Sequence, residues 1–196
     1  MSVALLAEPP LAPPADLGPY RFRDYAALAD EPRCELILGR FYLSPSPSPL
    51  HQVVVSILWK HLDRIAGHAG GLAFLAPLDV RLADHSVVQP DLIYLSAAGR
   101  SLVGERIDGA PDLLVEVLSP GTARRDRGEK LSLYAQSGVR EYWVVDPHER
   151  QVEFLVNEGG RFVVSVPAGN EHRSPALPEI HLDLAELWHE VAKRLP

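Results

Sequence analysis

The chain has 196 residues, a net charge of −7 and 46% hydrophobic residues, which suits one globular domain with a full core and excludes a disordered protein. The net negative charge counts against strong non-specific electrostatic binding to nucleic acid, because such binding usually requires a basic face. The single cysteine, Cys34, excludes an internal disulfide and a cysteine-based zinc cluster. With no apolar run near the ~18–20 residues of a membrane span and no signal-peptide pattern at the start, we expect a cytoplasmic protein that does not cross a membrane.

The chain predicts a loose arm followed by one domain of alternating helices and strands. Residues 1–19 are rich in proline and alanine and predict a flexible arm, so a single domain is expected over residues 20–196. The first third of the domain is expected to contain a short helix over 22–30, a hairpin over 35–43 turning at Gly39, a stiff Ser-Pro connector over 44–49 and a helix over 51–66. Strands over 72–82 and 87–95, a polar loop over 96–111 and a strand over 113–118 are expected next. The last part is expected to contain a helix over 122–137 stopped by Gly138, a strand over 141–147, a hairpin over 151–156 and 161–166, and an amphipathic helix over 183–194.

The order of these elements predicts the fold class. A strand, a helix and a strand follow one another over residues 113–145, which favours a parallel crossover, while the flanking hairpins favour antiparallel edges. We therefore expect a mixed α/β fold with a mixed β-sheet flanked by helices.

Glu116 is the most unusual residue in this pattern. It interrupts the apolar run from Leu113 to Leu118, which is typical of a central strand covered on both faces. A carboxylate there loses hydration and needs a cation, a metal or a proton. Lys130 or Arg140 would satisfy it as a plain ion pair.

Two further residues make a metal site the alternative to that ion pair. Asp91 lies in the preceding strand pattern, and Lys130 lies in the helix that follows Glu116. Carboxylates hold Mg²⁺ or Mn²⁺, and the ion acidifies its bound water, while a lysine can orient that water or stabilise charge on a phosphate. The structural alternatives are a turn or cap role for Asp91 and an i,i+4 salt bridge between Lys130 and Asp126.

A basic cluster lies next to these residues. Arg124, Arg125 and Arg127 precede Lys130 in the expected helix. They are candidate contacts to nucleic acid, and the alternative is a solvated helix face. The neighbouring strand residues Tyr142 and Trp143 are expected in the core rather than on a base-stacking surface.

Several segments resemble the Uma-two family of restriction endonucleases, a branch of the PD-(D/E)XK nuclease superfamily. They are Glu35-Leu36-Ile37-Leu38-Gly39-Arg40, the Ser-Pro repeats before His51, Gln89-Pro90-Asp91, Glu116-Val117-Leu118-Ser119-Pro120 with Lys130 and Tyr134, and Gly138-Val139-Arg140-Glu141-Tyr142-Trp143-Val144-Val145-Asp146-Pro147. The resemblance covers roughly residues 20–190.

The resemblance implies a restriction-endonuclease-like core in which Asp91 and Glu116 bind a divalent metal. The wider superfamily places its lysine two residues after the acid, which here is Leu118, so the lysine role passes to Lys130 on the following helix. Glu35 is implied as an auxiliary acid. His51 is a candidate general base or phosphate contact, or a structural histidine at a helix end.

The leading hypothesis is therefore a Mg²⁺- or Mn²⁺-dependent endonuclease that hydrolyses DNA phosphodiester bonds. Cutting both strands usually calls for two active sites, which makes a homodimer plausible. A non-catalytic binding or interaction module on the same fold is the alternative, motivated by the acidic net charge and the displaced lysine. Asp79 is expected either to support the site from behind or to lie on the surface.

Overall fold

The structure is a computed structural model that describes residues 17–28 and 33–195. Apart from residues 17–19, the predicted arm over 1–19 lies outside the described residues. The same holds for residues 29–30 of the first expected helix, whose described part is α1 (Phe22–Ala26).

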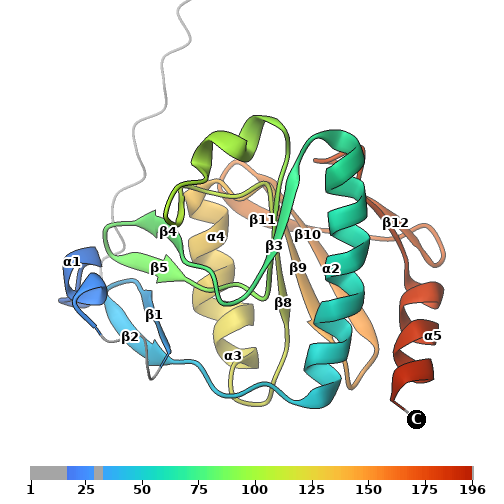
Figure 1. Ribbon diagram of the computed structural model, residues 1–196, viewed down its shortest axis with the longest axis horizontal. Coiled ribbons are helices and arrows are strands. Elements are labelled where there is room, and N and C mark those ends of the chain that lie inside the picture. The colour runs from blue at the N-terminus through green and yellow to red at the C-terminus, as the bar shows by residue number, and fades with distance from the viewer. Residues whose placement is uncertain (1–16, 29–32, 196) are drawn as a thin grey trace, which may run out of the picture.

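A six-stranded mixed sheet forms the centre of the molecule (Figure 1). Its only parallel neighbours among the described strands are β8 and β9, which confirms the predicted crossover. An antiparallel hairpin closes one edge of this sheet, also as predicted. In spatial order the strands are β11 (Arg161–Ser165), β10 (Gln151–Glu158), β9 (Glu141–Asp146), β8 (Leu113–Val117), β6 (Leu92–Leu95) and β3 (Leu72–Leu75).

Both faces of this sheet are covered. Helices α2 (Pro49–Ala69) and α5 (Leu184–Arg194) pack on one face, and α4 (Leu131–Ser137) packs on the other (Figure 1). Alternate residues of β8 belong to the two cores, with Val115 on the α2 side and Leu114 on the α4 side. The unbroken apolar run of β8 follows from this double coverage. The alternation places Glu116 on the side of α4.

A second sheet of five strands packs on the α4 side (Figure 1). The predicted hairpin at Gly39 is confirmed, with Gly39 at a φ of 76° in the left-handed region that glycine adopts easily. In spatial order the strands are β2 (Arg40–Leu43), β1 (Cys34–Ile37), β5 (Ser86–Val88), β4 (Val80–Ala83) and β7 (Ile107–Asp108).

The prediction of one continuous strand over 72–82 and another over 87–95 was wrong. Each is divided, so that β3 and β6 belong to the six-stranded sheet while β4 and β5 belong to the five-stranded one. Pro77 and Pro90 lie at the two breaks, where the missing N–H of proline cannot continue a hydrogen-bonded ladder. The second break matters for function because Asp91 sits in it, where the chain passes from one sheet to the other.

The segment after β8 contains an unusual helical turn. It comprises α3 (Ala123–Arg125), the π-helical turn η2 (Asp126–Lys130) and α4, and it ends at Gly138 as predicted. Both Asp126 and Lys130 are buried. π-Helical turns are rare and often occur at functional sites.

Smaller differences complete the comparison with the sequence prediction. Helix α2 is longer than the expected 51–66 because Ser48 caps its start by accepting a hydrogen bond from the His51 N–H. The expected loop over 96–111 contains η1 (Ala98–Leu102) and β7, and the pair β12 (Glu171–Arg173) and β13 (His181–Asp183) was not predicted. Within residues 17–28 and 33–195, no helix is long and apolar enough to span a membrane.

Candidate active site

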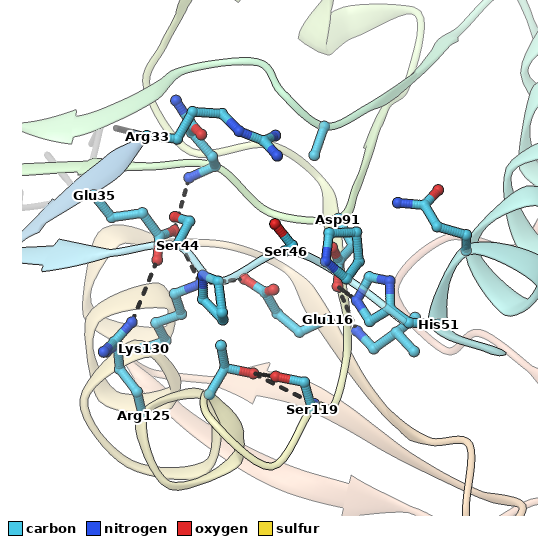
Figure 2. Close-up of a pocket in the computed structure, with 17 residues that line it drawn as sticks. Arg33, Glu35, Ser44, Ser46, His51, Asp91, Glu116, Ser119, Arg125 and Lys130 are labelled. Carbon is cyan, nitrogen blue, oxygen red and sulfur yellow. Dashed lines mark hydrogen bonds and ion pairs between the residues drawn. The ribbon is translucent and has the colours of Figure 1, made fainter. Parts of the chain in front are cut away.

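A cavity of about 120 Å³ lies where the two sheets meet the start of α2 and the turn after β8. All five residues predicted for the catalytic centre line it, although they come from five separate segments (Figure 2). They are Glu35 from β1, His51 from α2, Asp91 from the break before β6, Glu116 from β8 and Lys130 from η2.

Lys130 lies among three carboxylates. Its Nζ is 2.8 Å from Glu116 Oε1 and 2.9 Å from Glu35 Oε1 (Figure 2). The same Nζ is 3.4 Å from Asp126 Oδ1. Burial by itself would lower the pKa of Lys130, but the three carboxylates outweigh burial and raise that pKa well above its ordinary value. The side chain therefore stays a cation. Arg140, the other partner expected for Glu116, pairs with Asp112 instead, at 3.0 Å.

Glu116 lies in a strongly acidic environment. Burial raises the pKa of its carboxyl well above the ordinary value; Lys130 opposes this shift, and Asp126, Asp91 and Glu35 reinforce it. Its Oε1 accepts hydrogen bonds from Lys130 Nζ and from the Tyr134 hydroxyl, both at 2.8 Å. One buried ammonium thus faces three carboxylates, an imbalance that favours binding of a further cation.

Asp91 connects three elements at the edge of the cavity. Its Oδ2 accepts a hydrogen bond from the Val117 N–H at 2.7 Å and lies 3.1 Å from His51 Nε2. The structure therefore gives Asp91 a role beyond the turn or cap expected as the alternative. His51 is buried, and its Nδ1 has no hydrogen-bond partner among the described residues.

The donor set fits a hard divalent cation. The contacts of Glu116 end on Oε1 and those of Asp91 on Oδ2. Within the described part of the chain, the second oxygen of each carboxylate accepts no hydrogen bond, and both residues line the same cavity. No three His, Cys, Asp or Glu side chains of the described residues form a ready metal cluster. Water and substrate oxygens would complete the shell, as is usual for Mg²⁺.

Gln89, to which sequence reasoning gave no role, lines the cavity and contacts Glu35. The Gln89 N–H donates to Glu35 Oε1 at 2.8 Å, and Gln89 Nε2 donates to Asp79 Oδ1 at 2.9 Å. Asp79 also accepts from the Tyr25 hydroxyl at 2.7 Å, so it holds Gln89 in place rather than lining the cavity. The direct hydrogen bond from the Tyr134 hydroxyl to Glu116 Oε1 was also missed. The position of Gln89 directly before Pro90-Asp91 was the available signal.

The three predicted arginines point to different places. Arg125 lines the cavity, with Nη1 4.0 Å from Glu35 Oε2. Arg124 lines a neighbouring groove together with Arg125. Arg127 instead forms an ion pair with Glu153 at 2.6 Å and does not line the cavity.

The acidic cluster predicts how stability depends on pH. Burial raises the pKa of both the Glu116 and the Asp126 carboxyl in the folded protein, from ordinary values of 4.5 and 3.8. Their contribution to stability is therefore fully present below these ordinary values and is lost as the pH rises through the folded-state values. Glutamine at position 116 does not titrate, so the metal-free Glu116→Gln variant should gain stability relative to wild type as the pH rises.

Urea unfolding of both proteins in EDTA at pH 5 and at pH 8 measures this difference. A difference in unfolding free energy that is the same at both pH values would contradict the raised pKa of Glu116.

Comparisons with known proteins identify the family and the fold. The family model described as "Uma2: Putative restriction endonuclease" matches residues 21–185. Among solved structures, the chain is similar to a putative nuclease of the DUF820 family from Anabaena variabilis, with a TM-score of 0.74 and 20% sequence identity; the match covers 88% of this chain and 99% of that chain. A comparison with curated proteins found no match. The structural likeness confirms the predicted mixed α/β fold class.

Proposed function

Because the chain belongs to the Uma2 family of putative restriction endonucleases, we propose that it is a divalent-metal-dependent endonuclease that hydrolyses DNA phosphodiester bonds. Family and fold support a nuclease. The observation that carries the finer proposal is the meeting of Asp91, Glu116 and Lys130 in one cavity.

In this proposal Asp91 and Glu116 hold Mg²⁺ or Mn²⁺ through their oxygens that lack hydrogen bonds. When bound, the ion would neutralise charge on the phosphate and acidify a coordinated water. The Val117 N–H and His51 fix the orientation of Asp91. The Tyr134 hydroxyl fixes that of Glu116.

Lys130 acts as a fixed positive charge. Its raised pKa makes it a poor base, so it would not deprotonate water. As a permanent cation it can fill either role expected of it, orienting the water or stabilising charge on the phosphate. Glu35 and Asp126 hold the ammonium within reach of the cavity. Glu35 thereby serves as the auxiliary acid by positioning Lys130.

Incubation of the full chain with supercoiled plasmid tests this function. We expect nicked and then linear DNA in Mg²⁺ or Mn²⁺, and intact plasmid in EDTA. A labelled RNA of matched sequence, incubated in parallel, separates DNA from RNA as the substrate. Plasmid that stays supercoiled with every divalent metal, or cleavage that EDTA leaves unchanged, would contradict the proposal.

A non-catalytic binding module remains the second candidate, and one observation favours it. Lys130 is held by three carboxylates, which compete with any phosphate for its charge. Calorimetric titration with Mn²⁺ separates the two candidates, because the nuclease requires metal binding and the module does not.

Two further expectations belong to the proposal. Cleavage of both strands calls for two active sites, so we expect a homodimer, and a monomeric mass in sedimentation would contradict it. The cytoplasmic location expected from the single cysteine stays a prediction.

A further inference from the structure

A second hollow lies beside the cavity. It is a groove of about 780 Å³ between the β1–β2 hairpin and the α3–η2 segment. Its lining includes Tyr42 from the hairpin and Arg124, Arg125, Gly128 and Glu129 from the helical segment. Of its lining residues, Arg125 alone among those described also lines the cavity.

Arg125 joins the groove to the cavity, since it lines both. Its guanidinium carbon lies 4.2 Å from the centre of the Tyr42 ring, and its Nη1 is 4.0 Å from Glu35 Oε2. Figure 2 shows Arg125 at the rim of the cavity, next to Glu35 and Lys130. These contacts fix a positive charge at the boundary between the two hollows.

The groove has a basic lining. Arg124 and Arg125 outnumber the single carboxylate of Glu129 there. A phosphodiester strand carries one charge per nucleotide, so a strand with one phosphate at the cavity places a neighbouring phosphate near these arginines. Arginine forms strong bidentate hydrogen bonds with phosphate.

We propose that this groove binds the sugar–phosphate backbone of the substrate strand next to the scissile phosphate. The proposal rests on the nuclease function above and names the path of the strand. The face of Tyr42 is occupied by Arg125, which favours backbone contacts over base stacking. The groove volume suits a ligand of nucleotide size rather than a whole duplex.

Gly128 offers a way to fill the groove without disturbing the fold. It lines the groove within a helical turn, and a Cβ added there would meet no heavy atom within 4 Å. Glutamate and arginine at this position add comparable bulk with opposite charge. Arg127 provides a matched control because it belongs to the same segment but pairs with Glu153.

Fluorescence anisotropy with a labelled 20-nucleotide single strand, and with the matching duplex, measures binding at several salt concentrations with Ca²⁺ in place of Mg²⁺. Arg124→Ala should weaken binding of the single strand several-fold and reduce the salt slope by about 1, the expected loss for one phosphate contact. Gly128→Glu should weaken binding, Gly128→Arg should tighten it, and Arg127→Ala and Gly128→Ala should match wild type.

The outcomes separate the groove from the nuclease function. If wild type cleaves plasmid but Arg124→Ala and Gly128→Glu bind and cleave like wild type, the groove proposal is wrong and the nuclease stands. Equal weakening by Gly128→Glu and Gly128→Arg would also overturn it, because bulk rather than charge would then be decisive. If wild type neither binds nor cleaves DNA, both proposals fail.

Discussion

Replacement of Glu116 by glutamine is expected to lower metal-dependent DNA cleavage by on the order of 10²–10³-fold, because one of the two metal ligands loses its charge and several kcal/mol of charge stabilisation go with it. Glutamine keeps the shape of the side chain and still accepts hydrogen bonds from Lys130 and Tyr134. The fold should therefore survive. Initial rates of plasmid nicking in Mn²⁺, with circular dichroism of both proteins, measure the effect.

Glu153→Gln is the matched control. Glu153 is a half-exposed carboxylate that pairs with Arg127 away from the cavity, so its neutralisation should leave cleavage unchanged. Calorimetry should show weaker Mn²⁺ binding for Glu116→Gln alone. If Glu116→Gln retains more than half of the wild-type rate, Glu116 is not a metal ligand and the proposed mechanism fails.

The burial of β8 on both faces explains why Glu116 could be predicted as a site residue from the sequence. A charged residue in an apolar run is so costly to bury that few arrangements tolerate it. The search for partners then led to Asp91 and Lys130, and the structure brings both to the cavity that Glu116 lines. The order of strand, helix and strand over residues 113–145 separately predicted the parallel crossover between β8 and β9, which the structure confirms.

Other features of the site depend on the three-dimensional geometry of the helical segment after β8, which a pattern of residues in the sequence does not predict. The i,i+4 pair between Asp126 and Lys130 was the structural alternative to a catalytic role for Lys130. The structure has the pair, but the π-helical turn η2 holds it in the interior, where it helps to set the charge of Lys130. The extra residue in a π-turn rotates the following side chains relative to an α-helix, and this also bears on why Arg124, Arg125 and Arg127 diverge.

The divided strands were missed for a different reason. Prolines at positions 77 and 90 are visible in the sequence, but a pattern of apolar residues continues across both. The competing requirement is that a ladder needs an N–H at each step. The chain uses these breaks to pass between two sheets, and the position of Asp91 depends on the second break.

Replacement of Lys130 by methionine is expected to have the largest effect on stability. Lys130 is 3% exposed, and its removal leaves Glu116, Glu35 and Asp126 buried without their shared cation. Loss of one partner from a buried ion pair costs about 3–5 kcal/mol of unfolding free energy. Cleavage should fall as well, since no ammonium would then stabilise the negative charge on the phosphate. Urea unfolding at pH 7 in EDTA measures the stability.

The pH dependence distinguishes an electrostatic loss from a packing defect. Lys130 opposes the rise in the pKa of the Glu116 and Asp126 carboxyls. Without the ammonium, these two folded-state pKa values rise further and the protein becomes less stable as the pH increases. The loss caused by Lys130→Met should therefore be larger at pH 8 than at pH 5. Lys193→Met is the control, because Lys193 is exposed and pairs with the surface residue Glu190 at 2.7 Å; such a pair contributes about 0–1 kcal/mol. A loss for Lys130→Met that equals the control, or that does not vary with pH, would show that Lys130 is not the cation on which this acidic centre depends.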